Sequence, residues 1–267
     1  MRQLVVTVSA DEVELASDAL WSLGVVAIEE RRLDDGLIEL WTSMGDDAIE
    51  HDVVLPTDWP HRFVEVDSAI ADTWRDFASV VEVEPGLFVR PAWVPYDPPA
   101  GSTVLHIEPG STFGMGDHPT TRLCLSAVHR LVTPGATVLD VGCGSGVLAI
   151  AACRFGASRA VGVDIAPAAV PVAAANALAN GEAERVSVST TPLESVDGVY
   201  DLVLANILAP ALVALADDLR RVLAPGGSLV ISGILEHAHA HVLDALRPLR
   251  VEHTAVLDGW AAVTMRH

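Results

Sequence analysis

The stretch from Val138 to Ala152 constrains the fold of this 267-residue chain more than any other part of it. It reads VLDVGCGSGVLAIAA, which is an apolar strand, a loop with three glycines and a helix of small residues. Glycine lets the backbone approach a ligand closely and adopt conformations that other residues avoid. The start of the following helix favours an anionic ligand group. This order of elements predicts a site for a nucleotide-type cofactor.

The spacing of the glycines narrows the choice of cofactor. Gly142, Gly144 and Gly146 form G-x-G-x-G, and position 147 is Val. A dinucleotide fingerprint would be G-x-G-x-x-G, with its glycines arranged around a pyrophosphate. The pattern therefore favours S-adenosylmethionine (AdoMet), which has no pyrophosphate. A nicotinamide-dependent oxidoreductase is the less favoured alternative, because no hydride-transfer partner is evident in the sequence.

Strands and helices alternate regularly after Pro109. Such alternation predicts an α/β fold with a doubly wound, mostly parallel, Rossmann-like sheet. A final hairpin that turns at Asp258-Gly259 would add an antiparallel strand at the sheet edge. The seven expected strands are residues 137–141, 159–165, 185–189, 201–207, 228–234, 250–257 and 260–265.

The first part of the chain is organised differently and carries no chemical motif. It predicts a small α+β domain over residues 1–67, suited to docking a partner. A linker helix is expected at 68–81 and the catalytic domain at 82–267. Short extended pieces are expected at 87–94 and 102–108. Within the small domain, strands are expected at residues 3–8, 25–32, 36–42 and 61–67, and a helix at 11–24.

Four polar side chains follow strands of the predicted sheet, where ligands of doubly wound folds bind. Asp140 can reach a ligand ammonium group directly or through water. Asp164 has two oxygens that can accept hydrogen bonds from both ribose hydroxyls, although it can also cap the next helix. Glu194 would lie near the adenine, with a solvated carboxylate as the alternative. Asn206 ends a nearly continuous apolar strand and needs hydrogen-bond partners there, unless it serves as a turn or cap.

A second glycine-bearing segment, FGMGDHPTT at residues 113–121, precedes the sheet. Phe113, His118 and Thr121 lie in it just before the strand that carries the glycine loop. We expect this segment to cover the same ligand site. The alternative is that its two threonines only cap a helix.

Together these motifs resemble PrmA, the bacterial ribosomal protein L-eleven methyltransferase family. Its members carry F-G-T-G-x-H-x-T-T, and this chain has Met115 and Asp117 at two positions where it departs from that pattern. The likeness runs from about Trp74 to the C-terminus and is looser before residue 67. The other shared motifs are DVGCGSG at 140–146, GVD at 162–164, ANILA at 205–209 and SGIL at 232–235.

The resemblance implies a class I methyltransferase that methylates amino groups of a large-subunit ribosomal protein, free rather than assembled. It implies AdoMet contacts at Thr121, Gly142, Asp164 and Asn206, together with docking by the N-terminal domain and a linker helix that lets this domain swing. Methyl transfer needs an aligned, neutral amine, whereas a free lysine has a pKa of about 10.4 that desolvation lowers. Asn206 would orient the amine. His118 would either assist proton removal or only order its loop.

Composition sets the remaining limits. A net charge of −20 argues against broad nucleic-acid binding and is compatible with a basic protein partner. The three cysteines have no metal or redox spacing, which fits a reduced cytoplasmic compartment. No apolar run reaches the roughly 18 residues of a membrane span, and the first residues lack signal-peptide organisation. His237 and His241, one helical turn apart, are interpreted as solvated, so no metal site is expected. The oligomeric state cannot be inferred from the sequence.

Several alternatives stay open at this stage. An amide or adenine N-methyltransferase would carry N-P-P-Y or a close relative, whereas Ile-Leu-Ala follows Asn206 here. Another protein lysine or a small-molecule amine is a credible acceptor. A non-enzymatic AdoMet-binding module is also conceivable.

Overall fold

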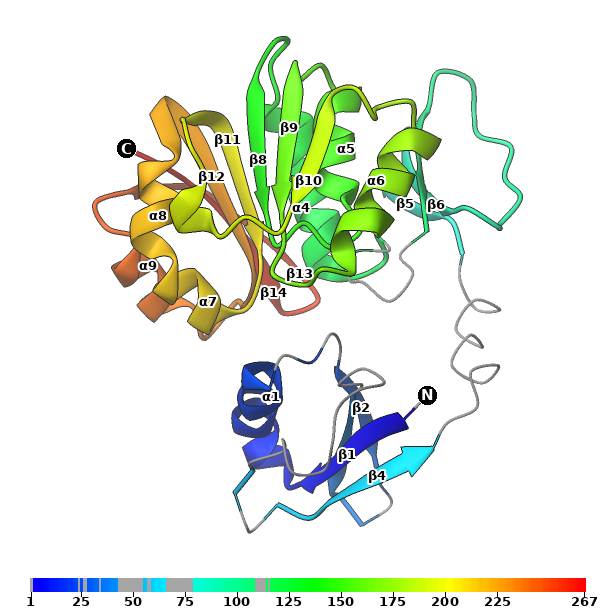
Figure 1. Cartoon of the computed structure of the whole chain (residues 1–267), viewed down its shortest axis with the longest axis vertical. Coiled ribbons are helices and arrows are strands. Elements are labelled where there is room, and N and C mark those ends of the chain that lie inside the picture. Colours follow the sequence, from blue (N-terminus) through cyan, green and yellow to red (C-terminus); the bar gives the residue numbers. More distant parts are fainter. Residues whose placement is uncertain are drawn as a thin grey trace. The chain divides into compact units, whose positions relative to one another are not determined.

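The computed structural model describes residues 2–23, 25, 28–33, 35–42, 55–56, 59–65, 79–108, 114 and 116–267. The chain divides into two compact units, Met1–Ala78 and Ser79–His267. The first is a small sheet with a helix, and the second is built around a larger sheet (Figure 1).

The first unit is an antiparallel sheet with strand order β2-β3-β1-β4. Alternating residues of β1, among them Leu4 and Val6, form its core with Ala16 and Leu20 of the helix. The predicted strands and helix are confirmed, with β1 beginning one residue earlier than expected and β3 two residues later. The elements are β1 (Arg2–Val8), a 3-10 turn (Ala10–Glu12), α1 (Val13–Ser22), β2 (Ile28–Arg32), β3 (Ile38–Thr42) and β4 (His61–Glu65).

The second unit opens with a three-stranded sheet of order β5-β6-β7. Its strands are β5 (Val81–Glu84), β6 (Leu87–Pro91) and β7 (Thr103–Ile107). Most of the expected linker helix, residues 68–78, lies outside the described residues. The end of that prediction needs correction, because Ser79 and Val80 have no regular structure and Val81 begins β5. Val81 pairs with Val89 across the first hairpin, and this pairing holds it in a strand.

The larger sheet contains the seven strands that the alternation predicts, in the order β10-β9-β8-β11-β12-β14-β13. Neighbours from β10 to β12 are parallel, and β14 is antiparallel to both β12 and β13. The terminal hairpin is therefore at the edge, but its antiparallel strand lies one position inside it. The strands are β8 (Thr137–Val141), β9 (Arg159–Val163), β10 (Val186–Ser189), β11 (Tyr200–Asn206), β12 (Leu223–Leu235), β13 (Arg250–Leu257) and β14 (Trp260–Arg266).

Helices cover both faces of this sheet (Figure 1). Successive side chains of a strand point to opposite faces. Accordingly Leu202 and Leu204 of β11 join the core under α4, α5 and α6, whereas Val203 and Ala205 join the core under α7, α8 and α9. The doubly wound prediction is confirmed. The helices are α4 (Pro119–Leu131), α5 (Val147–Arg154), α6 (Ala169–Ala179), α7 (Ala209–Ala214), α8 (Ala216–Arg221) and α9 (Ala240–Ala245).

Candidate active site at the carboxyl edge of the sheet

The glycine loop leaves the carboxyl end of β8 and leads into α5. The amides of Gly142 and Cys143 both donate to the carbonyl of Val163 on the neighbouring strand, at 2.8 and 3.1 Å. Gly142 and Gly146 have φ values of 72° and 79°, a region that side chains disfavour. A Cβ at Gly142 would also collide with Ile207. The loop conformation therefore requires glycine for both reasons.

Strand register brings three of the predicted residues into one row. Val163 of β9 pairs with Val141 of β8, and Val141 pairs with Ala205 of β11. The next residue of each strand is Asp164, Gly142 and Asn206 respectively. The sheet thus places a carboxylate and an amide on either side of the first glycine of the loop.

Asp164 is partly exposed and already holds two backbone groups. One carboxylate oxygen accepts from the amide of Gly144 at 2.8 Å, and the other accepts from the amide of Ala166 at 2.9 Å. Each oxygen keeps a further lone pair, so the carboxylate can still accept two hydroxyl hydrogen bonds. The capping interaction and a ribose-binding role are therefore compatible in this geometry.

Asp140 lies beneath the loop, with only 1% of its surface exposed. Its Oδ2 accepts from the amide of Ala149 at 3.2 Å, whereas its buried Oδ1 has no hydrogen-bond partner among the described residues. Burial raises the pKa of Asp140 to about 7, and the nearby Asp164 charge adds to this. A buried polar atom without a partner is rare in a folded protein and calls for an explanation.

The hydroxyl oxygen of Thr121 is a second buried polar atom that resembles Asp140 Oδ1. It is 1% exposed in the first turn of α4, and its buried Oγ1 has no hydrogen-bond partner in the part of the chain that the structure describes. Thr121 Oγ1 and Asp140 Oδ1 are thus both buried polar atoms that no described residue satisfies.

His118 forms the N-cap of α4. Its Nδ1 accepts from the backbone amide of Thr120 at 3.3 Å and lies 2.8 Å from the Thr120 hydroxyl. The ring meets Trp260 edge-on, with centroids 5.1 Å apart. Burial lowers the pKa of His118 and so favours the neutral ring. A neutral ring that accepts at Nδ1 carries its proton on Nε2, where a base would need a lone pair.

The remaining predicted site residues are Asn206, Glu194 and Phe113. Asn206 is partly buried, and its side chain makes no hydrogen bond to the described residues. Glu194 is exposed in the 3-10 turn Leu193–Ser195 that follows β10. Phe113 lies outside the described residues. Among the described residues, no group of three or more His, Cys, Asp and Glu is placed to hold a metal ion, and His239 bonds the carbonyl of Leu235.

Three residues at this edge were not singled out from the sequence. Ile165 follows Asp164 and is 93% exposed, which is unusual for a large apolar side chain. Ser145 and Asn176 form a buried hydrogen-bonded link beside the glycine loop. The spacing of Asn176 and Asn180, one helical turn apart in an otherwise apolar helix, is the signal that could have identified the link.

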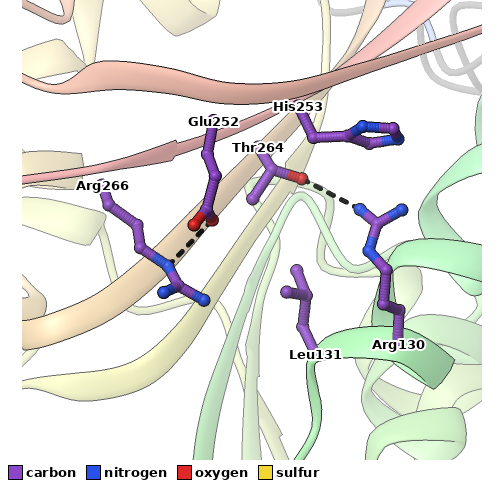
Figure 2. A pocket seen from close by; sticks show the side chains of 6 residues that line it. All are labelled: Arg130, Leu131, Glu252, His253, Thr264 and Arg266. Atoms are coloured by element: carbon purple, nitrogen blue, oxygen red, sulfur yellow. Dashed lines mark hydrogen bonds and ion pairs between the residues drawn. The ribbon is translucent and has the colours of Figure 1, made fainter.

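An open cavity of about 350 Å³ lies elsewhere, at the opposite end of α4 (Figure 2). There Arg130 donates to the Thr264 hydroxyl at 3.3 Å, and Arg266 pairs with Glu252 at 3.0 Å. β14 runs antiparallel to β12, so its last residue, Arg266, lies toward the amino ends of the parallel strands. The cavity therefore lies at the edge opposite the glycine loop and contains none of the predicted site residues.

The strand order and the glycine loop after β8, followed by a carboxylate at the end of β9, define the class I methyltransferase fold. Residues 61–267 match the family model described as "Ribosomal protein L11 methyltransferase (PrmA)". The chain belongs to this family. None of the helices in the described part of the chain is long and apolar enough to cross a membrane.

Curated relatives carry the same family name. A ribosomal protein L11 methyltransferase of Geobacter metallireducens is 49% identical over 175 residues, which cover 65% of this chain and 57% of the relative. The match therefore spans little more than half the length of that relative. A relative from Halalkalibacterium halodurans is 33% identical over 248 residues, covering 92% of this chain and 76% of its own length.

A solved structure agrees with this assignment. The ribosomal protein L11 methylase of Lactobacillus delbrueckii subsp. bulgaricus is 30% identical, with a TM-score of 0.66. The superposition covers 72% of this chain and all of that one.

Proposed function

We propose that this chain binds AdoMet at the carboxyl edge of its larger sheet and methylates amino groups of a ribosomal protein of the L11 type. The row of Asp164, Gly142 and Asn206 carries the proposal, because it sets ligand-binding groups along one edge of the fold. Membership in the family supports the choice of acceptor.

The residues at this edge fit the chemistry of AdoMet. The carboxylate of Asp164 would accept from the ribose hydroxyls, and the exposed Ile165 beside it would cover a face of the adenine. Asp140 Oδ1 and Thr121 Oγ1 would gain partners from the methionine part or from water bound with it, which accounts for their present lack of any. When bound, the cofactor supplies a methyl group already activated by its sulfonium.

The acceptor requires little beyond alignment and a neutral nitrogen. We place Asn206 next to the acceptor, where its amide oxygen would orient the amine. Desolvation at this edge would lower the pKa of a lysine amine from its usual value of about 10.4. Replacement of Asn206 by Ala would then lower kcat more than it raises the KM for AdoMet.

For His118 we propose capping of α4 instead of proton abstraction. The Nδ1 lone pair is occupied by Thr120, so the neutral ring has no acceptor left for an amine proton. The cap fixes where α4 begins and therefore where Thr121 lies.

The partner is proposed to be the free ribosomal protein, docked by the small N-terminal unit in the cytoplasm. A net charge of −20 favours a basic partner over nucleic acid. Another protein lysine or a small-molecule amine is the alternative acceptor.

The direct test incubates the purified chain with methyl-labelled AdoMet and a purified L11-type ribosomal protein, and reads label transfer and intact mass. The expected result is label on the ribosomal protein, with its mass raised by whole methyl groups. An unrelated basic ribosomal protein serves as the matched control. No transfer from a chain that binds AdoMet would indicate a different acceptor or a binding module.

A further inference from the structure

Ser145, inside the glycine loop, is fully buried and forms hydrogen bonds in two directions. Its hydroxyl donates to the carbonyl of Gly114 at 2.7 Å. Its own carbonyl accepts from Nδ2 of Asn176 at 2.9 Å. One residue of the loop is thereby linked both to the segment before α4 and to α6.

Asn176 completes the link and is itself only 2% exposed. Its Oδ1 accepts from the amide of Glu108, and its Nδ2 donates to the carbonyl of Glu108, both at 2.9 Å. The second Nδ2 hydrogen is the one that bonds Ser145. Both amide hydrogens of Asn176 are therefore committed to backbone carbonyls.

The two backbone positions held in this way, Glu108 and Gly114, lie close together in sequence. The approach of Gly114 to Ser145 is tight: a Cβ at Gly114 would lie 2.7 Å from Ser145 Oγ, and its φ of 105° also disfavours a side chain. We call the four residues Glu108, Gly114, Ser145 and Asn176 the Ser145–Asn176 clasp. The clasp ties the glycine loop to the segment that leads into α4.

We propose that Ser145 and Asn176 are positioning residues for the cofactor, which they do not themselves contact. The clasp holds the glycine loop at a fixed separation from the start of α4, so that the loop amides and Thr121 face one ligand. This proposal rests on the proposed AdoMet site. It predicts that cofactor affinity depends on the clasp more than on comparable buried hydrogen bonds nearby.

Asn180 provides that comparison within the same helix region. It is 8% exposed and holds the backbone of His106 in β7 by the same two bonds, at 2.9 and 2.7 Å. Its Nδ2 also donates to the carbonyl of Asn176, at 2.8 Å. Asn180 therefore has the same bonding pattern as Asn176, but its bonds do not include the glycine loop.

The test compares Asn176→Asp with Asn180→Asp. Each variant sets a carboxylate against two carbonyl oxygens, so both should lower the melting temperature. Titration calorimetry with S-adenosylhomocysteine separates them. We expect Asn176→Asp to raise Kd at least about tenfold, since it removes buried bonds that hold the loop, and Asn180→Asp to stay within about twofold. Equal Kd changes in the two variants, or none in Asn176→Asp, would overturn the proposal.

A second pair serves in case Asn176→Asp does not fold. Ser145→Ala deletes the bond to Gly114. Ser158→Ala, just before β9, deletes the bonds of an exposed hydroxyl to the carbonyls of Gly135 and Ala136, 2.9 and 3.1 Å long. We expect a Kd increase of about fivefold for Ser145→Ala and no change for Ser158→Ala. A Ser145→Ala variant with wild-type affinity would overturn the positioning role of the clasp but leave the proposed AdoMet site standing. A wild-type chain that does not bind S-adenosylhomocysteine would overturn the proposed function as well.

Discussion

The polar groups at the two edges of the larger sheet differ in whether they find partners within the protein. At the amino edge, Asp201 accepts from both the amide and the hydroxyl of Thr137, at 2.8 and 2.9 Å, and Arg266 bonds Glu252 and Ser228. At the carboxyl edge, Thr121 and Asp140 each bury an oxygen that has no hydrogen-bond partner among the residues described. Within the described residues, even the buried carboxylate of Glu182 at the amino edge has an ion-pair partner in Arg185, whereas the carboxyl edge retains two buried oxygens that a ligand can satisfy.

The largest expected effect comes from Asp164→Ala. If this carboxylate accepts two ribose hydroxyls, its loss should weaken AdoMet binding about a hundredfold or more, because hydrogen bonds to charged groups each contribute about 1.5–3 kcal/mol. Calorimetry with AdoMet measures this change. Asp201→Ala at the opposite edge is the matched control and should change stability but not affinity. Unchanged affinity in Asp164→Ala would rule out the ribose assignment.

The pH dependence of the free energy of unfolding, compared between wild type and Asp140→Asn, tests the buried carboxylate of Asp140. Burial raises the pKa of Asp140 to about 7, so the folded chain binds this proton more tightly than the unfolded chain does. Its contribution to the free energy of unfolding is therefore lost as pH rises from about 4 to about 7. Asn carries no charge at any pH. Urea unfolding should show the ligand-free variant to be more stable than wild type at pH 8, by up to about 4 kcal/mol, and nearly equal at pH 4.

A constant difference across that range would show that Asp140 stays ionised in the folded protein. Addition of AdoMet should reduce the gap at pH 8, because a ligand partner for Oδ1 stabilises the charged form.

His118 allows a smaller and more selective test. His118→Ala should cost about 1 kcal/mol of stability, the usual value of an N-cap, whereas His118→Asn keeps an accepting side chain and most of that stability. If His118 only caps α4, the Asn variant should also keep most of the methyltransfer rate at saturating substrate. A stable Asn variant with a rate as low as that of the Ala variant would restore the proton-transfer role.

The smallest effect is expected at the cavity of Figure 2. Arg266 and Glu252 are both nearly half exposed, and ion pairs of this kind contribute about 0–1 kcal/mol. Arg266→Ala should therefore change the melting temperature slightly and AdoMet affinity not at all. A clear loss of affinity would show that the two edges are coupled and that the contrast between them is too simple.

The sequence predicted the features that depend on local pattern. The regular alternation of apolar strand segments with helices located every strand of the larger sheet, and the glycine spacing located the loop, because both follow from patterns over short stretches of sequence. The positions of Asp164 and Asn206 at strand ends followed from the same pattern. That Asp164 and Asn206 lie on either side of Gly142 depends on strand register, which could be seen only in the folded structure.

What the sequence did not reveal depends on residues far apart in the chain. Asn176 bonds the backbone of Glu108, just after β7, and Asn180 bonds that of His106 within β7, 68 and 74 residues earlier, and no local pattern encodes those distances. Val81 looked like the end of a helix, yet pairing with Val89 makes it a strand. The burial of Thr121 and Asp140 likewise follows from packing and not from residue type.

The position of β14 has a consequence for synthesis. This strand follows β13 in the chain but lies between β12 and β13 in the sheet. During translation, β13 therefore leaves the ribosome before the strand that must join it to the rest of the sheet. Until residues 260–266 emerge, the flank of β12 remains an open edge, the kind of surface at which chains pair with one another. A strand that is made after β13 thus closes the sheet from the inside.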